Sequence, residues 1–570
     1  MIADTKTPGG HGEPPLLVDI RGLSIGFAAS GSGAPIVRDI DLAIRAGECV
    51  ALVGESGSGK SLTARSLLNL AGDGARVESR RFHLRGRDAR GFREADWRRL
   101  RGTVTGLVMQ DALVSLDPLR TIGQEVGEVL SEHRILRGRT AIAARVRDVL
   151  GKVGIPDPEV RSRQYAHQLS GGLRQRALIA AAIAGDPDLI IADEPTTSLD
   201  VAVQAQVLQV LAERVREGAG LLLISHDLAV VSGIADRVIV MREGRAVDSG
   251  PTADVLMRPR HPYTRQLIAA IPSAASRGRR LASATPVGPS GPARAAPPPR
   301  RGPGDVPVLE VRGIAKDYPT RPGIGRAGST LTALTDVSFA VRAGEVVGIV
   351  GESGSGKSTC AKIVLGLLAP DRGAVRLLGQ PWSGIREPER RPLRPRLQYI
   401  PQDALSSFDP RYRVSEIIAA NLAGLRPADR PGRVAALLEQ VGLRADLAGR
   451  HPRALSGGQR QRVSIARALA AEPALIVCDE PVSALDIGIQ AQVLDLLGDL
   501  RDRLGTALLF ISHDLGVIQH LADRVLVFHD GRLVEEGPVG EVLCTPGHAY
   551  TRTLLAAQPR LAGGLPAHAH

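Results

Sequence analysis

The chain has 570 residues, 43% of them hydrophobic and 23% charged, which is ordinary for a globular protein and too long for one hydrophobic core. Several domains are therefore expected. No apolar run approaches the roughly 20 residues that span a bilayer, and the first residues lack the apolar core of a signal peptide. These features argue against a membrane-spanning or secreted protein.

The net charge of +12 leaves three kinds of partner open: nucleic acid, an anionic membrane surface, or none in particular. Basic residues do not alternate with aromatic ones, as stacking on nucleic-acid bases would require. The four cysteines, Cys49, Cys360, Cys478 and Cys544, are scattered and form no C-x-x-C pair. That pattern favours a reducing compartment and predicts neither disulfides nor a zinc site.

The first motif is the glycine-rich stretch GESGSGKS, which follows an apolar run at residues 49–53 and precedes apolar spacing typical of a helix. Its glycines let backbone N–H groups curl around phosphate oxygens, and the helix N-terminus adds positive charge. Lys60 is expected to reach the β- and γ-phosphates and Ser61 to ligate Mg²⁺. A structural glycine-rich turn is the alternative. The predicted ATP-binding residues here are Gly54, Glu55, Ser56, Gly57, Ser58, Gly59, Lys60 and Ser61.

A second anion site is predicted at Ser170, Gly171 and Gly172, which precede a sequence of helical character. A serine N-cap followed by glycines leaves the backbone N–H groups of the first helical turn pointing outward. Alone, this pattern is a weak signal. It gains weight from its position about twenty residues before the next acidic motif.

That acidic motif follows a predicted buried strand at residues 189–193, which ends in Asp193 and continues into Glu194. A carboxylate at the end of an apolar strand has no packing reason and suits the ligand shell of Mg²⁺. Glu194 is placed to polarise an attacking water as a general base. An acidic strand end that caps the next helix is the alternative interpretation.

All of these motifs recur in the second half of the chain, in the same order and at a nearly constant offset. This indicates a tandem duplication of one domain, because the period is far too long for a solenoid. The repeated residues are Gly351, Glu352, Ser353, Gly354, Ser355, Gly356, Lys357, Ser358 and Thr359, then Ser456, Gly457, Gly458 and Gln459, then Asp479 and Glu480.

Four segments are predicted: a domain over residues 15–272, a linker over 273–306, a second domain over 307–559 and a flexible tail over 560–570. The linker is rich in Pro, Ala, Gly and Arg and lacks apolar periodicity, so we expect it to be extended and mobile. Its basic residues could contact acidic lipid, but a solvated linker is favoured.

These motifs closely resemble those of the ABC-type ATPases. The resemblance implies an α/β fold with two tandem P-loop NTPase domains, each with a RecA-like core, an antiparallel β subdomain and a helical subdomain. It implies Q-loop glutamines at Gln110 and Gln402, D-loop acids at Asp200 and Asp486, catalytic switch histidines at His226 and His513, and adenine-stacking aromatics at Phe27 and Tyr318. Either aromatic could instead be a core residue. The implied Mg²⁺ ligands are Ser61, Gln110, Asp193, Ser358, Gln402 and Asp479.

In ABC-type ATPases two domains close head to tail, so each ATP lies between the phosphate loop of one and the serine-glycine-glycine turn of the other. The resemblance therefore implies that Lys60 shares an ATP with Ser456, and Lys357 with Ser170. The one departure is Leu173, where the second half has Gln459. Because the phosphate contacts come chiefly from the serine hydroxyl and backbone amides, both sites are expected to hydrolyse ATP.

Other stretches resemble the oligopeptide and dipeptide importers within that family. These are the segments after the Q-loops, at residues 111–118 and 403–410, and the tails HPYTR and HAYTR, at residues 261–265 and 548–552. The first half is similar to the D-type ATPase of these importers and the second half to the F-type. Several relatives continue into a cysteine-rich iron–sulfur segment, but residues 272–307 contain no cysteine, so no cluster is predicted.

This resemblance implies a peripheral subunit on the cytoplasmic face of the inner or plasma membrane that energises two transmembrane permease subunits. An extracytoplasmic solute-binding protein would deliver the substrate, and no nucleic acid is expected. The alternative is a soluble double-domain ABC ATPase acting on ribosomes or DNA, but those relatives place a long charged helical arm between their domains. The substrate, whether peptide, glutathione or nickel complex, cannot be predicted because specificity lies in the binding protein and the pore.

Overall fold

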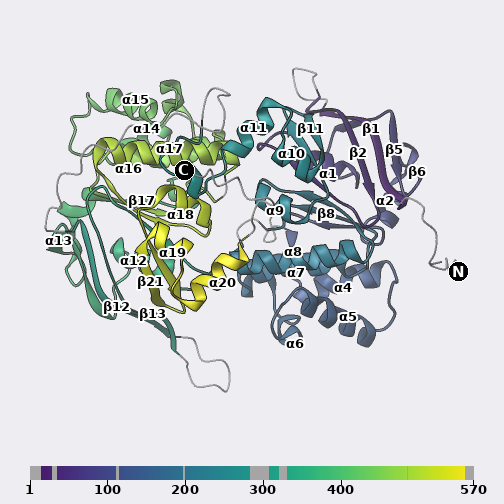
Figure 1. Ribbon diagram of the computed structural model, residues 1–570, viewed down its shortest axis with the longest axis horizontal. Helices are drawn as coiled ribbons and strands as arrows, with labels where there is room; N and C mark the ends of the chain where they lie inside the picture. The colour runs from purple at the N-terminus through teal and green to yellow at the C-terminus, as the bar shows by residue number, and fades with distance from the viewer. Residues whose placement is uncertain are drawn as a thin grey trace. The chain divides into compact units, whose positions relative to one another are not determined.

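The computed structural model describes residues 14–27, 35–110, 115–196, 199–282, 307–319, 330–483 and 485–558 (Figure 1). These residues form two compact units. The first unit holds the described residues up to 196 and those from 204 to 264, and the second holds 199–203 and 265–558. Most of the predicted linker, the predicted tail and residues 111–114 after the first Q-loop glutamine lie outside the described residues.

The core of the first unit is a six-stranded sheet in the order β11-β10-β3-β9-β8-β7, parallel except for β11. The strands are β3 (Cys49–Val53), β7 (Thr105–Val108), β8 (Leu189–Asp193), β9 (Gly220–Ile224), β10 (Arg237–Arg242) and β11 (Arg245–Pro251). Strands β3, β8 and β9 are buried along their whole length, which explains their continuous apolar sequence. Parallel strands bring their carboxyl ends to one edge, so the loops after these three strands meet there.

An antiparallel sheet of the first unit shares a hydrophobic core with β3, β8 and β9. Its order is β2-β1-β5-β6, and β4 also pairs with β1. The strands are β1 (Leu16–Phe27), β2 (Val37–Arg45), β4 (Ala75–Glu78), β5 (Arg81–Leu84) and β6 (Arg87–Asp88). Every second residue of β2 from Ile40 onward is buried, as expected for a strand with one face on a core.

Some helices of the first unit pack against these sheets. Others, α4, α5 and α7, pack mainly against one another and form a separate helical group. The helices are α1 (Lys60–Ser66), α2 (Glu94–Leu100), α4 (Ile122–Glu132), α5 (Arg139–Lys152), α6 (Pro158–Arg161), α7 (Gly171–Ile183), α9 (Leu228–Ile234) and α10 (Thr252–Met257), together with the larger part of α8 (Val201–Arg216) and the start of α11 (Pro262–Ala269), whose remaining residues belong to the second unit. Helix α4 begins at Thr121, which forms a capping box with Gln124, and its apolar face is buried. The predicted RecA-like core, antiparallel β subdomain and helical subdomain are confirmed.

The second unit repeats this plan. One sheet has the order β13-β12-β15-β16 and the other the order β17-β18-β19-β14-β20-β21. The strands are β12 (Leu309–Pro319), β13 (Thr330–Val341), β14 (Val346–Val350), β15 (Arg372–Leu377), β16 (Gln380–Pro381), β17 (Leu397–Ile400), β18 (Leu475–Asp479), β19 (Ala507–Ile511), β20 (Arg524–His529) and β21 (Arg532–Pro538). The larger sheet is parallel apart from β21.

The helices of the second unit occupy corresponding places around its sheets (Figure 1). They are α12 (Lys357–Val364), α13 (Glu387–Arg390), α14 (Val414–Ala419), α15 (Arg430–Gln440), α16 (Gly457–Leu469), α17 (Ile487–Leu504), α18 (Leu515–Leu521), α19 (Val539–Cys544) and α20 (Ala549–Ala557). The duplication inferred from the sequence is therefore a duplication of the whole fold.

The first ten residues of the predicted linker differ from the expected mobile segment, because residues 273–282 fold against α17 and α18 within the second unit. The backbone N–H groups of Leu281 and Ala282 donate to Asp495 at 3.1 and 2.8 Å, and the Leu281 side chain is buried. Arg280 pairs with Asp499 at 2.9 Å. The buried Leu281 side chain and the contacts with Asp495 and Asp499 explain why this part of the segment packs against the second unit.

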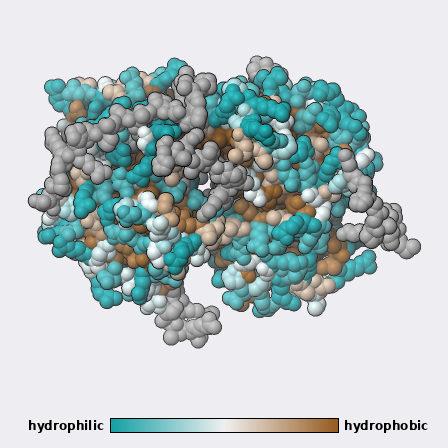
Figure 2. All heavy atoms as spheres, viewed as in Figure 1, coloured by the Kyte–Doolittle hydropathy of each residue, from teal (hydrophilic) through white to brown (hydrophobic). Residues whose placement is uncertain are grey.

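Figure 2 shows hydrophilic residues over most of the visible surface of each unit, with smaller patches of hydrophobic residues among them. Most of the large apolar side chains lie instead in the buried hydrophobic cores of the two units. Across the parts of the chain that the structure describes, no helix is both long enough and apolar enough to cross a membrane.

Candidate functional site

The glycine-rich loop of each unit connects a core strand to a helix, β3 to α1 in the first unit and β14 to α12 in the second. Gly54 has φ +144°, and a Cβ there would lie 2.1 Å from the carbonyl oxygen of Met241. At Gly351 the φ is +147° and a Cβ would lie 2.2 Å from the carbonyl oxygen of Phe528. Only glycine fits this close approach, so the first residue of the loop is explained by geometry.

The lysine of each loop is buried and folds back onto the loop backbone. Lys60 Nζ donates to the carbonyl oxygens of Gly54 and Glu55 at 2.8 and 2.7 Å. Lys357 Nζ makes the same two bonds in the second unit, at 2.7 and 2.6 Å. Burial lowers the pKa of Lys357, although nearby carboxylates oppose this effect. The loop thus holds a cationic group directly beside backbone amides at a helix N-terminus, which is an arrangement for phosphate.

An oxygen-rich pair lies next to the first loop. The Ser61 hydroxyl donates to Asp193 Oδ1 at 2.9 Å, and Asp193 is 1% exposed. Its Oδ2 accepts no hydrogen bond from the residues that the structure describes, and the Arg65 guanidinium lies 3.7 Å away. Burial raises the pKa of Asp193. A hydroxyl beside an under-satisfied buried carboxylate fits Mg²⁺, which prefers oxygen ligands and would keep the carboxylate ionised.

The second unit differs at this point. Tyr399 donates its hydroxyl to Asp479 Oδ2 at 3.3 Å, where the first unit has Leu107 in the corresponding place on its edge strand. Burial raises the pKa of Asp479 as it does that of Asp193. Ser358 follows the loop lysine at the start of α12, as Ser61 does in α1. The same residue types for a divalent cation are thus present in both units, but the aspartate accepts from the loop serine in the first unit and from Tyr399 in the second.

The structure brings together three of the predicted residues in the first unit. Gln110 Nε2 donates to Glu194 Oε2 at 2.9 Å, and His226 Nδ1 lies 3.4 Å from the same oxygen. Glu194 has a φ of +49°, a left-handed conformation that is costly for a residue with a side chain. Burial alone would lower the pKa of His226, but its hydrogen bond to Glu194 and that carboxylate's charge raise it overall.

The second unit repeats this cluster closely. Gln402 Nε2 donates to Glu480 Oε2 at 2.9 Å, and His513 Nδ1 lies 3.3 Å from it. Glu480 has a φ of +47°. Burial would raise the pKa of Glu480, but the hydrogen bond from His513 lowers it overall, so the carboxylate is held ionised and able to accept a proton. The pKa of His513 is raised in turn, against the effect of its burial.

The two serine-glycine-glycine turns begin α7 and α16. Ser170 caps α7 by accepting from the backbone N–H of Leu173 at 3.4 Å, and Ser456 caps α16 by accepting from Gln459 at 3.3 Å. The side-chain oxygen of Gln459 in turn accepts a hydrogen bond from the backbone N–H of Ser456 at 3.0 Å, which completes a capping box. A leucine side chain has no hydrogen-bond acceptor. At Leu173 the second of the two capping-box hydrogen bonds, the one to the backbone N–H of Ser170, therefore cannot form.

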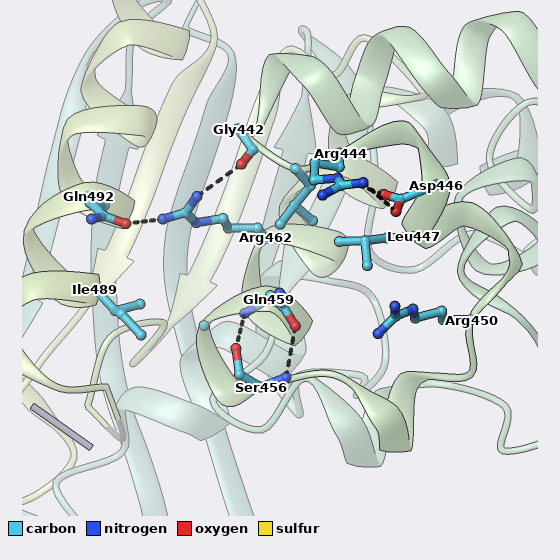
Figure 3. Close-up of a pocket in the computed structure, with 12 residues that line it drawn as sticks. Gly442, Arg444, Asp446, Leu447, Arg450, Ser456, Gln459, Arg462, Ile489 and Gln492 are labelled. Atoms are coloured by element: carbon cyan, nitrogen blue, oxygen red, sulfur yellow. Dashed lines mark hydrogen bonds and ion pairs between the residues drawn. The ribbon is translucent and has the colours of Figure 1, made fainter. Parts of the chain in front are cut away.

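Beside the second of these turns lies a cavity of about 470 Å³ (Figure 3). Arg462 lines one wall and donates to the carbonyl oxygen of Gly442 and to Gln492, and Arg444 pairs with Asp446 nearby. Burial lowers the pKa of Arg462. Three arginines, Arg444, Arg450 and Arg462, and a single acid, Asp446, line the recess beside Ser456, so it carries net positive charge, which suits an anionic ligand.

The remaining predicted residues occupy element ends. Asp200 and Asp486 accept from the backbone N–H of Val203 and Ile489 at 2.9 and 3.0 Å, as caps of α8 and α17. The two predicted adenine-stacking aromatics are half-buried, Phe27 at the end of β1 and Tyr318 near the end of β12. Their contact with a base stays a prediction.

The tail motifs contain a tyrosine that the site prediction did not include. Tyr263 and Tyr550 each accept a hydrogen bond from the backbone N–H of the second loop residue, Glu55 at 3.1 Å and Glu352 at 3.0 Å. The signal that could have pointed to them is the recurrence of His-x-Tyr-Thr-Arg at the end of both halves.

The chain was compared with known families and proteins. A family model described as ABC transporter matches residues 37–197 and 334–483. A second, described as oligopeptide/dipeptide transporter, C-terminal region, matches residues 247–297 and 534–568, so it covers both tail motifs.

Three relatives align along nearly the whole chain. The oligopeptide transport ATP-binding protein OppD of Mycobacterium tuberculosis is 40% identical and covers 95% of this chain and 98% of its own. The glutathione import ATP-binding protein GsiA of Salmonella typhimurium is 41% identical, covering 95% of this chain and 89% of its own. The peptidoglycan transport ATP-binding protein YejF of Agrobacterium fabrum is 40% identical, covering 95% and 96%.

Proposed function

The chain belongs to the ABC transporter family, and we propose that it is the subunit that binds and hydrolyses ATP to energise an importer of oligopeptides or dipeptides. The observation that carries the proposal is the duplicated cluster at the carboxyl edge of each core sheet. There a loop lysine, a strand-end aspartate and a Gln–Glu–His group lie together in both units. The matches of both tails to the oligopeptide/dipeptide region support an importer of this class.

In the proposed reaction, the loop amides and lysine of each unit hold the phosphates of one ATP. The hydrogen bonds of Gln110 and His226 to Oε2 orient Glu194, which accepts the proton of the attacking water. Gln402, His513 and Glu480 act likewise in the second unit. The lowered pKa of Glu480 supports this role, because a general base must be unprotonated before the reaction begins.

Mg²⁺ would supply charge neutralisation for the β- and γ-phosphate oxygens. Ser61, Gln110 and Asp193 would hold it in the first unit, and Ser358, Gln402 and Asp479 in the second. The orphaned Oδ2 of Asp193 supports this assignment.

We further propose that the two units close head to tail around two ATP. The turn at Ser456 would then complete the site of Lys60, and the turn at Ser170 would complete the site of Lys357. The basic, recessed surface around Ser456 supports the idea that this turn receives an anion. Because both general bases are present, both sites should turn over.

The proposed partners are two transmembrane permease subunits, which would dock near the Q-loops on the cytoplasmic face of the membrane, and an extracytoplasmic solute-binding protein. A soluble double-domain ATPase acting on ribosomes or DNA remains the competing function. The extent of the alignment with OppD, GsiA and YejF favours the importer.

The test is reconstitution. The chain should copurify with co-expressed permease subunits, and in proteoliposomes its ATPase activity should rise several-fold when a binding protein loaded with peptide is added. If only a glutathione-loaded binding protein stimulates the ATPase, the proposed importer function stands and its substrate is glutathione. Copurification with ribosomes or DNA, without binding to permeases, would overturn the proposed function.

A further inference from the structure

In each unit the tail tyrosine contacts the nucleotide loop. The hydroxyl oxygen of Tyr263 accepts from the backbone N–H of Glu55, which lies 208 positions earlier in the chain. Tyr550 repeats the bond to Glu352 across 198 positions. Both tyrosines are at least nine-tenths buried. Two copies of the same contact, made by separate parts of the chain, indicate that it serves the loop.

The contacted N–H belongs to the peptide unit that also binds the loop lysine. Gly54 supplies the carbonyl of this peptide unit and Glu55 supplies its N–H, and that carbonyl accepts from Lys60 Nζ at 2.8 Å. A peptide group is planar, so fixing the direction of the N–H also fixes the direction of the carbonyl opposite it. The hydroxyl of Tyr263 therefore constrains the orientation of the Gly54 carbonyl, which in turn binds the ammonium group of Lys60.

The first tail is fastened to the core by one carboxylate. Asp248, on β11, accepts from the backbone N–H groups of Arg260 and His261 and from the Thr264 hydroxyl, each at 3.1 Å. His261 Nδ1 accepts from the backbone N–H of Tyr263 at 3.2 Å, which caps the start of α11. The histidine, tyrosine and threonine of the tail motif thus have distinct tasks, and two of the three anchor the helix that carries the tyrosine.

The second tail is fastened in the same way. Glu535, on β21, accepts from the backbone N–H groups of Gly547 and His548 at 2.7 and 3.2 Å and from the Thr551 hydroxyl. His548 Nδ1 accepts from the backbone N–H of Tyr550 at 3.2 Å. Glutamate stands here where the first tail has aspartate, and its longer side chain makes the corresponding three contacts.

The tyrosine rings are held by residues at the end of the strand that neighbours the loop strand. The Arg242 guanidinium lies 4.9 Å from the ring centre of Tyr263, and His529 stacks on Tyr550 with ring centres 3.9 Å apart. Burial raises the pKa of Tyr550 to about 12, so its hydroxyl stays neutral at physiological pH. Each ring is thereby fixed on its face and each hydroxyl is directed at the loop.

We propose that Tyr263 and Tyr550 are positioning residues for ATP, through which the C-terminal extension of each half sets the conformation of the nucleotide loop. This inference rests on the proposed function and adds a task for the extension. A loop held in its binding conformation loses less conformational entropy when it closes on phosphate, so the extension should raise ATP affinity.

The test removes only the hydroxyl, in the full chain. Tyr263→Phe, Tyr550→Phe and the double variant are titrated with MgATP, and KM and kcat for ATP hydrolysis are measured. Each single variant should raise the Kd of its own site about three- to tenfold, as expected for one hydrogen bond, with kcat within about twofold. The double variant should raise both Kd values. A rise in KM without a fall in kcat is the signature of uniform binding, which a general loss of structure would not produce.

Thr264→Val and Thr551→Val are the matched controls, because each deletes a buried hydroxyl from the same extension without touching the loop. They should lower the melting temperature and leave the Kd for MgATP within about twofold. An unchanged Kd in the tyrosine variants would overturn the inference, and so would an equal rise in the threonine variants. Lys60→Ala and Lys357→Ala test the proposed function separately, since an ATP-binding protein must lose affinity when these lysines are removed.

Discussion

The two units of this chain keep the same proposed catalytic groups and differ in some of the residues around them. The Gln–Glu–His clusters agree within 0.1 Å in their closest distances, 2.9 and 3.4 Å in one unit and 2.9 and 3.3 Å in the other. Nearby, Tyr399 replaces Leu107 and Gln459 replaces Leu173. This agreement at the proposed reacting groups supports the proposal that both sites hydrolyse ATP.

The two differences near the proposed sites leave the Gln–Glu–His clusters unchanged. Tyr399 adds a hydrogen bond to Asp479, and Gln459 adds half of a capping box, but neither alters the position of a general base. At these two positions the halves therefore differ by one local hydrogen bond each.

The largest expected effect comes from the general bases. Glu194→Gln and Glu480→Gln should each lower ATPase activity about 100-fold, since general-base catalysis contributes about 10²–10⁴-fold and closure couples the two sites. The measurement is steady-state phosphate release by the full chain with its permeases. A variant that keeps half of the native activity would show that its partner site works alone, which contradicts coupled closure.

A pH-dependent effect should follow from the His513–Glu480 contact. The pKa of His513 is raised above its ordinary 6.5 and that of Glu480 is lowered below its ordinary 4.5. The attraction is therefore fully present between these two values. It is lost as the pH rises through the raised pKa of His513 or falls through the lowered pKa of Glu480.

His513→Gln should accordingly lower the melting temperature most between pH 4.5 and 6.5, by about 2–4 °C for a contribution of about 1 kcal/mol, and less as the pH rises. His226→Gln should show the same loss of effect at alkaline pH. The exposed His451 provides the control through His451→Gln, since among the residues that the structure describes this histidine forms no ion pair with a carboxylate. A deficit that stays constant with pH would refute a charged pair. Melting curves by circular dichroism at a series of pH values supply the measurement.

The smallest expected effect concerns the capping box of α16. Gln459→Leu should lower the free energy of opening of the first turn of α16 by about 0.5–1 kcal/mol. The mirror substitution, Leu173→Gln, should raise that of α7 by a similar amount. Amide hydrogen exchange in the two turns measures both changes. If neither turn responds, the difference between the halves at this position has no effect on helix stability.

Much of the fold and site could be predicted because the signals are local. The apolar runs before the loops became the buried strands β3 and β14, and the glycines at 54 and 351 are required by positive φ and close backbone approach. The contact of Tyr263 with Glu55 could not be predicted, because no local pattern reveals which residues meet across 208 positions. The docking of residues 273–282 was missed for a similar reason: their composition is that of a linker, and their partners are acids far along the chain.

We propose that one chain binds two ATP and hydrolyses both. The direct measurement is the amount of ATP retained by the Glu194→Gln/Glu480→Gln double variant, with the mass of the particle determined in the same sample. Two ATP per single chain is the predicted result. Retention of one ATP per chain would contradict this proposal. Retention of ATP only by particles that contain two chains would contradict it as well.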